Sequence, residues 1–366
     1  MSRFQQALAM GAGALSALAL LLALALGGGL TPLPVLLFMA LGALTLVRLR
    51  WPLSLWIDTA LAVFGAAALV WMVEIYDTVP AYYWVALAAT WLFAWLFVER
   101  LSQAIRAEQL PEQGFNLLIP IVFGAALLVI WEVVTLGANV PQVLLPPPSQ
   151  IAARFAASIP TLWADFLQTF KAVLAGYVIG CGAGFAVAIL VDRSPFLKRG
   201  VLPIGNFVSA LPIIGIAPIL VMWFGFDWPS KAAVVVVMVF FPMLVNTVAG
   251  LNAAGAMERD MMRTYAASYW QTLAKLRLPA AAPFIFNALK INSTLALIGA
   301  IVAEFFGTPI VGMGFRISTE VGKLNIDLVW AEIAVAAIAG SAFYGVIALI
   351  ERAVTFWHPS VRGGRT

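Results

Sequence analysis

The sequence predicts an all-α, polytopic transmembrane protein of about ten helices. Of its 366 residues, 63% are hydrophobic and only 10% are charged, and the mean hydropathy is +0.99. A soluble domain carries about 25% charged residues, so no soluble fold would hide this much apolar surface. The apolar residues also form continuous runs near the roughly 20 residues that a helix needs to cross the hydrocarbon of a bilayer.

Ten such runs follow one another, each dominated by Leu, Ala, Val and Phe. Only helices and closed barrels satisfy their backbone in lipid, and barrel strands would alternate apolar and polar residues. The first run is long and further spans follow at once, so we expect it to be retained as a membrane helix. The expected spans are 4–27, 31–48, 53–73, 81–98, 115–136, 166–191, 201–224, 231–253, 284–306 and 329–351.

Lysine and arginine gather on one side of these spans when both termini are placed in the cytoplasm. Only five of the 21 then lie outside: Arg154, Lys171, Lys231, Arg316 and Lys323. Because cytoplasmic loops carry an excess of Lys and Arg, we expect a multi-pass protein of the cell (inner or plasma) membrane with both termini inside.

A long polar stretch at 99–114 divides the chain, with four expected helices before it and six after it. We therefore expect an N-terminal four-helix membrane unit at 1–98, a cytoplasmic linker at 99–114 and a six-helix core at 115–360. Within that core, the polar-bearing segment 254–283 lies between two apolar spans on the cytoplasmic side.

The segment 254–283 resembles the cytoplasmic coupling loop of ABC-type import permeases. Asp260 falls at the acidic position of that motif, Met261 and Met262 at its two alanine positions, and Ala266 at its glycine position. Leu276, Leu278 and Pro279 fall on its closing Ile-x-Leu-Pro.

Three other stretches resemble the same family. They are the proline-rich Leu144–Gln150, the proline-broken Leu211–Gly225 and the turn Gly312–Gly314. The resemblance covers about residues 115–360. In this region the chain is similar to the permeases for sulfonates, taurine, nitrate and cyanate, and thiamine or riboflavin precursors. The resemblance says nothing of the four leading helices.

This resemblance implies a type I importer permease that moves a small polar organic solute, delivered by a periplasmic or extracellular binding protein. It implies coupling through 254–283 to separate ATPase subunits that bind ATP–Mg, no cofactor on this chain, and a second permease subunit, identical or different. The coupling residues it implies are Asp260, Met261, Met262, Arg263, Ala266, Ser268, Gln271, Leu278 and Pro279.

The residues of this loop also predict its local structure. Ser268 and Gln271 have the spacing of a capping box, which predicts a helix starting at Ser268 after a break at Ala266–Ala267. Tyr265 and Tyr269 would share one apolar stripe only if helix continued through that break. Alanine takes a positive φ less readily than glycine. Without the resemblance, an amphipathic loop at the membrane surface explains the pattern equally well.

Prolines interrupt the span 201–224 and remove backbone donors there. Broken helices in membranes occur where the backbone is buried in protein or lines a cavity, so we expect a translocation path or gate, with a packing kink as the alternative. The residues assigned to it are Asn206, Ser209, Leu211, Pro212 and Pro218.

Glycines four apart mark one face of the span 166–191. Gly176, Gly180 and Gly184 would let another helix approach closely. The partner helix lies either in this chain or in a second subunit.

Several classes of site are excluded. One cysteine, Cys181, and one histidine, His358, give neither a disulfide framework nor a His/Cys metal site. The chain lacks the Gly-x4-Gly-Lys-Ser/Thr phosphate loop, and no nucleophile–base pair is recognisable, so we expect no catalytic residue and no enzyme. The net charge of +4 is scattered among loops and forms no basic face for nucleic acid.

Four acids lie in or near apolar spans: Asp58, Glu74, Glu132 and Glu304. We expect shallow, interfacial positions, and no spacing predicts a proton relay. The alternatives to an importer permease are a stand-alone secondary transporter or channel, and a membrane scaffold or intramembrane enzyme. No internal repeat is visible, which disfavours an inverted-repeat transporter.

Overall fold

The computed structural model of the protein describes residues 2–25, 55–75, 79–107, 109, 112–209, 212–307 and 310–357. Within these ranges the chain is built from helices and contains no strand. Seven of the described helices are long and apolar enough to cross a membrane. The predicted all-α polytopic fold is therefore confirmed, although the number of ten spans is only approximate.

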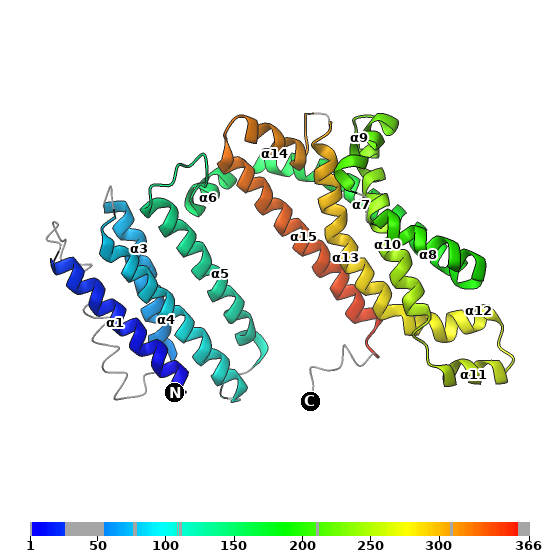
Figure 1. Cartoon of the computed structure of the whole chain (residues 1–366), viewed down its shortest axis with the longest axis horizontal. Helices are drawn as coiled ribbons and strands as arrows, with labels where there is room; N and C mark the ends of the chain where they lie inside the picture. The colour runs from blue at the N-terminus through cyan, green and yellow to red at the C-terminus, as the bar shows by residue number, and fades with distance from the viewer. Residues whose placement is uncertain are drawn as a thin grey trace. The chain divides into compact units, whose positions relative to one another are not determined.

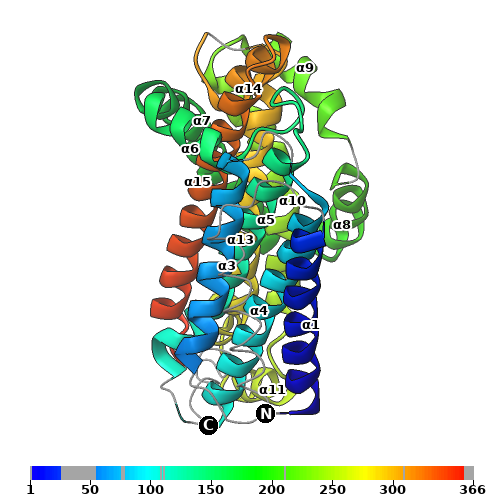
Figure 2. The same cartoon turned by 90° about the vertical axis from the view of Figure 1, so that its left-hand side faces the viewer.

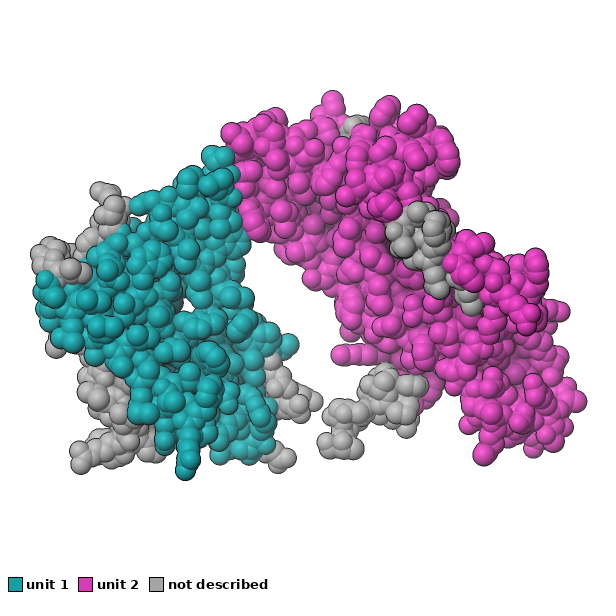
Figure 3. Space-filling model, viewed as in Figure 1, with its two compact units in different colours: residues 1–152 teal, residues 153–366 magenta. Residues whose placement is uncertain are grey.

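The chain forms two compact units, residues 1–152 and 153–366 (Figure 3). In the first unit, the central helix α4 (Ala81–Arg106) packs against all three of its neighbours (Figures 1 and 2). These neighbours are α1 (Arg3–Ala25), α3 (Leu55–Ile75) and α5 (Glu112–Gly137). The expected span 31–48 lies outside the described residues.

The compact units divide at a different place from the predicted functional boundary. Helix α4 continues to Arg106, so the first half of the expected linker 99–114 is the end of a long apolar helix. Helix α5, predicted as the first helix of the core, packs against α3 and α4 and belongs to the first unit. The division into 1–98, 99–114 and 115–360 stays a prediction about function.

The second unit is built around helix α10 (Trp228–Leu251), which packs against α7 (Ile159–Arg193) and α13 (Leu278–Glu304). Helix α15 (Ile326–Val354) covers α13. Shorter helices lie at the two ends of this unit, with α14 at one end and α11 and α12 at the other (Figure 1). The short helices of this unit are α8 (Pro195–Ser209), α9 (Ile213–Phe224), α11 (Ala256–Thr264), α12 (Tyr269–Thr272) and α14 (Met313–Gly322). Helix α6 (Pro148–Ala157) crosses the boundary between the two units.

Two expected spans differ from the structure. The span 201–224 is split into α8 and α9, because Pro212 stands directly before α9 in an extended conformation. The span 284–306 starts earlier than expected, because α12, a π-helical turn at Leu273–Arg277 and α13 join into one helix, Tyr269–Glu304.

The glycine face of α7 is occupied by α10. An added Cβ would lie 2.6 Å from the Ala232 carbonyl oxygen at Gly176 and 2.9 Å from Val236 Cα at Gly180. At Gly184 it would lie 2.5 Å from a carbonyl oxygen of α10. These glycines therefore let two helices of the same chain approach closely.

A matched pair of alanines tests this close contact. Gly180→Ala should destabilise the protein by about 1–3 kcal/mol, because the new methyl overpacks the α7–α10 interface. Gly182→Ala is the control, since nothing lies within 4 Å of its added Cβ. Thermal unfolding of the purified protein in detergent measures both, and equal midpoints would contradict the close packing.

Candidate functional site

The segment 254–283 forms two short helices separated by a tight turn. Helix α11 ends in a Schellman motif: Ala267 N–H donates to the Met262 carbonyl at 3.0 Å and Ala266 N–H to the Arg263 carbonyl at 2.9 Å. Ala266 itself has φ of 51°, in the left-handed region. The predicted break is thus confirmed, and alanine stands where this motif favours glycine.

The second helix of the loop starts as predicted. Ser268 accepts a hydrogen bond from Gln271 N–H, and the Gln271 side chain accepts one from Ser268 N–H at 2.8 Å. This capping box confirms the start of α12 at Ser268. Because the chain turns at Ala266, Tyr265 is 78% exposed whereas Tyr269 is half-buried, so the two do not share one stripe.

Helix α11 presents an apolar stripe to its surroundings. Met257, Met261 and Tyr265, spaced four apart, are 82%, 54% and 78% exposed. Met262 is half-buried, and Asp260 is exposed and pairs with Arg263 at 3.3 Å. None of the residues of α11 is buried.

The other end of the loop is anchored in the bundle. The Arg277 guanidinium donates to both Asp192 carboxylate oxygens, at 2.6 and 2.7 Å, and its Nε donates to the Leu251 carbonyl at 2.9 Å. The Tyr269 hydroxyl also donates to Asp192, at 2.9 Å. Leu278 packs with Leu251 in the same region, and Pro279 lies in the first turn of α13. The loop is thereby joined to the C-terminal ends of α7 and α10.

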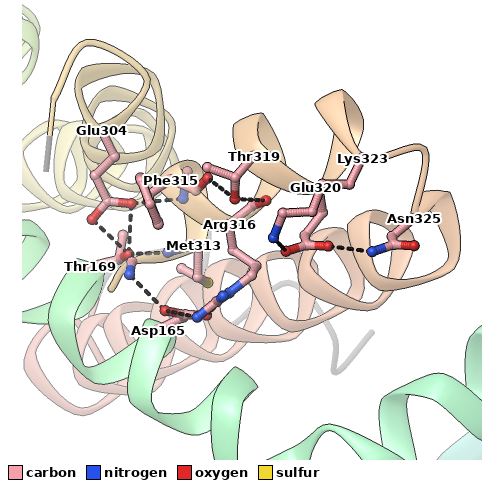
Figure 4. Close-up of polar contacts among 12 residues, drawn as sticks. Asp165, Thr169, Glu304, Met313, Phe315, Arg316, Thr319, Glu320, Lys323 and Asn325 are labelled. Carbon is pink, nitrogen blue, oxygen red and sulfur yellow. Dashed lines mark hydrogen bonds and ion pairs between the residues drawn. The ribbon is translucent and has the colours of Figure 1, made fainter. Parts of the chain in front are cut away.

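A second polar cluster lies at the opposite end of the second unit (Figure 4). Asp165, fully buried on α7, accepts hydrogen bonds from Gly312 N–H at 2.7 Å and from Arg316 Nε at 2.8 Å. Thr169 Oγ donates to Glu304 at 2.8 Å, and Gly314 N–H donates to Glu304 at 2.7 Å. These contacts hold the turn before α14.

Glu304 stands at the end of its helix, where an interfacial position was predicted, and its side chain is buried in the protein. It is the last residue of α13, as expected for the end of a span, but only 2% of it is exposed. Gly312 takes φ of 142°, and a Cβ at Gly314 would lie 2.2 Å from the Ile301 carbonyl oxygen. The two glycines therefore permit the close turn that brings backbone donors to Glu304.

Charges on α14 are held in their ionised forms. The hydrogen bond to Asp165 raises the pKa of Arg316 above its ordinary value. Burial opposes ionisation of Glu320, but hydrogen bonds from Lys323 and Asn325 hold the pKa of Glu320 below its ordinary value. Arg316 therefore stays a cation beside buried Asp165.

The structure describes only some of the residues predicted to form the gate. Pro212 precedes α9 and Pro218 lies inside it. Asn206 and Ser209 lie on α8 without described side chains, and Leu211 lies outside the described residues. His358 also lies outside the described residues, and among those described no cluster of three metal-ligating side chains occurs.

Sequence reasoning missed Asp192, Asp165 and Thr169. Asp192 follows directly on an apolar span and precedes Arg193, and this position at a helix end is the one signal in the sequence. Thr169 lies inside the expected span 166–191, where a single hydroxyl is unremarkable. Their partners come from segments more than 80 residues away, so no local pattern identifies them.

Replacing Ala266 with glycine should stabilise the protein. Left-handed backbone costs an alanine about 1–2 kcal/mol, and glycine adopts it freely but loses more entropy on folding. We expect Ala266→Gly to gain about 0.5–1 kcal/mol and Ala267→Gly to gain nothing, because Ala267 lacks a positive φ. Thermal unfolding in detergent compares the two, and a loss of stability at position 266 would contradict the observed turn.

Comparisons with known proteins concern mainly the second unit. Residues 176–362 match the family described as the binding-protein-dependent transport system inner membrane component. The chain is 29% identical over 236 residues to the riboflavin transport system permease protein of Chloroflexus aurantiacus. The aligned residues make up 64% of this chain and 88% of that protein.

Two further relatives are similar. A probable ABC transporter permease protein of Haemophilus influenzae is 30% identical over 216 residues, 59% of this chain and 88% of that protein. The formylaminopyrimidine transport permease protein of Halalkalibacterium halodurans is 29% identical over 247 residues, 67% of this chain and 98% of that protein. Each match covers most of the relative and leaves much of this chain outside it.

Proposed function

The chain belongs to the family of binding-protein-dependent transport system inner membrane components, and on that premise we propose that its loop 254–283 receives the work of a separate ATPase. It is the membrane-spanning permease subunit of an ABC importer and a transport component rather than an enzyme. Permeases of this family associate with ATPase subunits and a substrate-binding protein. In this chain we assign the ATPase contact to helix α11.

The observation that carries the proposal is the exposed stripe of Met257, Met261 and Tyr265. Large exposed apolar patches on a polar helix mark contact sites for other proteins. Methionine is unbranched and polarizable, so it adapts to a partner's surface better than a rigid side chain. Exposed charges beside the stripe, among them Asp260 and Arg263, supply a polar rim. The stripe suits a groove on a soluble ATPase.

A loop lying in the membrane surface is the competing interpretation. It would also expose apolar side chains on an amphipathic helix. It predicts no ATPase contact and would suit a stand-alone secondary transporter or channel. The two interpretations differ in what substitutions of α11 do to ATPase binding.

Substitutions on α11 separate these interpretations. Asp260→Lys together with Met261→Glu should weaken ATPase binding by at least about tenfold, because reversed and buried charges are costly in an interface. Co-purification of the ATPase and coupled ATP hydrolysis measure the effect. Lys290→Gln on α13 is a control outside the loop. Unchanged ATPase binding in the doubly substituted chain would reject the coupling role.

We also propose that both termini and the loop face the cytoplasm, because Lys and Arg are concentrated on that side. In a Cys181→Ser background, an impermeant thiol reagent added to intact cells should label Val321→Cys and spare Ala274→Cys. These positions lie on α14 and in the π-helical turn, at opposite ends of the second unit. Labelling of position 274 from outside would overturn the orientation.

The solute is proposed from the relatives. Their names include riboflavin and formylaminopyrimidine, and others name aliphatic sulfonates and taurine. We propose a small polar organic solute of the heterocyclic vitamin-precursor or sulfonate type, chosen by the binding protein. Identifying the ligand that co-purifies with that binding protein tests this directly.

The remaining assignments concern the solute path through this chain and the other subunits of the importer. We place the gate at the proline-broken segment of α8 and α9, around Pro212 and Pro218, where interrupted helices suit a cavity lining. A second permease subunit, identical or different, and ATP–Mg on the ATPase chains belong to the same arrangement. We assign the solute path to residues 115–360 and no transport step to residues 1–98.

A further inference from the structure

We propose that Asp192 and Arg277 are positioning residues that make helix α7 follow the loop 254–283 when the ATPase displaces it. This inference rests on the proposed coupling function and adds the route by which a displacement leaves the loop. The inference is based on the C-terminal end of α7. There Asp192 binds Arg277 and Tyr269, and Arg193 lies over the rings of Tyr269 and Trp270.

The geometry and burial of the Asp192–Arg277 ion pair suit it to transmit a displacement of the loop to α7. The guanidinium meets the carboxylate with two parallel hydrogen bonds, an arrangement that fixes direction as well as distance. Only 4% of the Asp192 side chain and 13% of the Arg277 side chain are exposed, so water does not compete. Losing either partner would leave the other charge buried and unpaired, which is strongly destabilising.

Further contacts extend this link on both sides. The Tyr269 hydroxyl donates to Asp192, so α12 and the π-helical turn meet the same carboxylate. The Arg193 guanidinium lies 5.4 Å from the Tyr269 ring and 5.6 Å from the Trp270 ring, within cation–π range. Arg277 also binds the Leu251 carbonyl at the end of α10.

Helix α11 by contrast has no such attachment. None of its residues is buried, and the side-chain hydrogen bonds of its described residues stay within α11. A force applied to its exposed stripe reaches the bundle by two routes: directly into α10 through residues 252–255, and through the turn at Ala266 into α12 and Arg277. On the second route, the first transmembrane helix met besides α13 itself is α7.

Helix α7 is suited to carry the displacement further. Its 35 residues make a rod about 52 Å long at 1.5 Å per residue. Near its other end, Asp165 and Thr169 accept hydrogen bonds from the backbone of Gly312 and Met313 at the start of α14, and the Thr169 hydroxyl donates to Glu304 (Figure 4). One helix thus links the loop to the polar cluster at the opposite end of the same unit.

The experiment follows α7 without needing the solute. The full chain with Cys181→Ser and Leu167→Cys is labelled with an environment-sensitive fluorophore and assembled with its ATPase in lipid nanodiscs. Leu167 is 50% exposed and lies on α7 near Asp165. We expect the emission to change between the nucleotide-free and the ATP–vanadate states, and Arg277→Gln to abolish this change while the ATPase stays bound and hydrolyses ATP.

Lys290→Gln is the matched control, because it breaks an ion pair of 2.7 Å that joins α13 to α15 and leaves α7 untouched. It should keep the emission change. An Arg277→Gln protein that keeps the full change overturns the link, and so does an unsubstituted protein that shows none. Loss of the ATPase from Arg277→Gln also overturns it, because Arg277 would then only shape the docking surface.

Milder variants keep the test decisive if Arg277→Gln does not fold. Arg277→Lys keeps the charge and loses the two-pronged contact, and Tyr269→Phe removes one hydrogen bond and keeps the ion pair. The emission change should fall in the order unsubstituted, Tyr269→Phe, Arg277→Lys. Equal changes in all three would overturn the link. ATPase binding is measured separately, so a chain that never binds the ATPase refutes the coupling function itself.

Discussion

Three buried aspartates, each paired with an arginine from another helical segment, fix three of the helix contacts of this protein. In lipid no hydrophobic force drives helices together, so close packing and polar pairs decide their arrangement. A buried charge that loses its partner is strongly destabilising, so alternative arrangements that separate these pairs are excluded. The pairs are Asp58–Arg100 between α3 and α4, Asp165–Arg316 between α7 and α14, and Asp192–Arg277 between α7 and the π-helical turn.

Two of these three aspartates lie on α7, which makes this helix the organising element of the second unit. Its middle carries Gly176, Gly180 and Gly184, which bring the backbone of α10 into contact. Close packing of this kind fixes the distance between the two helices. The ion pairs at the two ends of α7 are directional and fix its register. The loop and the turn before α14 are therefore both positioned with respect to the same helix.

Local sequence patterns predicted most of the architecture and part of the loop. Apolar runs located the membrane helices because hydropathy is a property of each segment alone. The capping box at Ser268 and Gln271 and the break before it were predicted because those contacts span only a few residues. The partner of Asp192 was not, because Arg277 is 85 residues away. The contact of α5 with α3 and α4 was missed for a different reason, because the polar stretch 99–114 was taken as the boundary between two membrane units.

The strained turn at Ala266 explains why the loop consists of two parts with different tasks. A non-glycine residue stays in left-handed backbone only when the surrounding structure determines it. Here the Schellman hydrogen bonds end α11 on one side, and the capping box starts α12 directly on the other. The turn therefore separates a helix with no buried residue from one tied to Asp192. Because the two hydrogen-bonded motifs share no residue, the exposed stripe of α11 can suit a partner's surface without altering the contacts that hold α12 on α7.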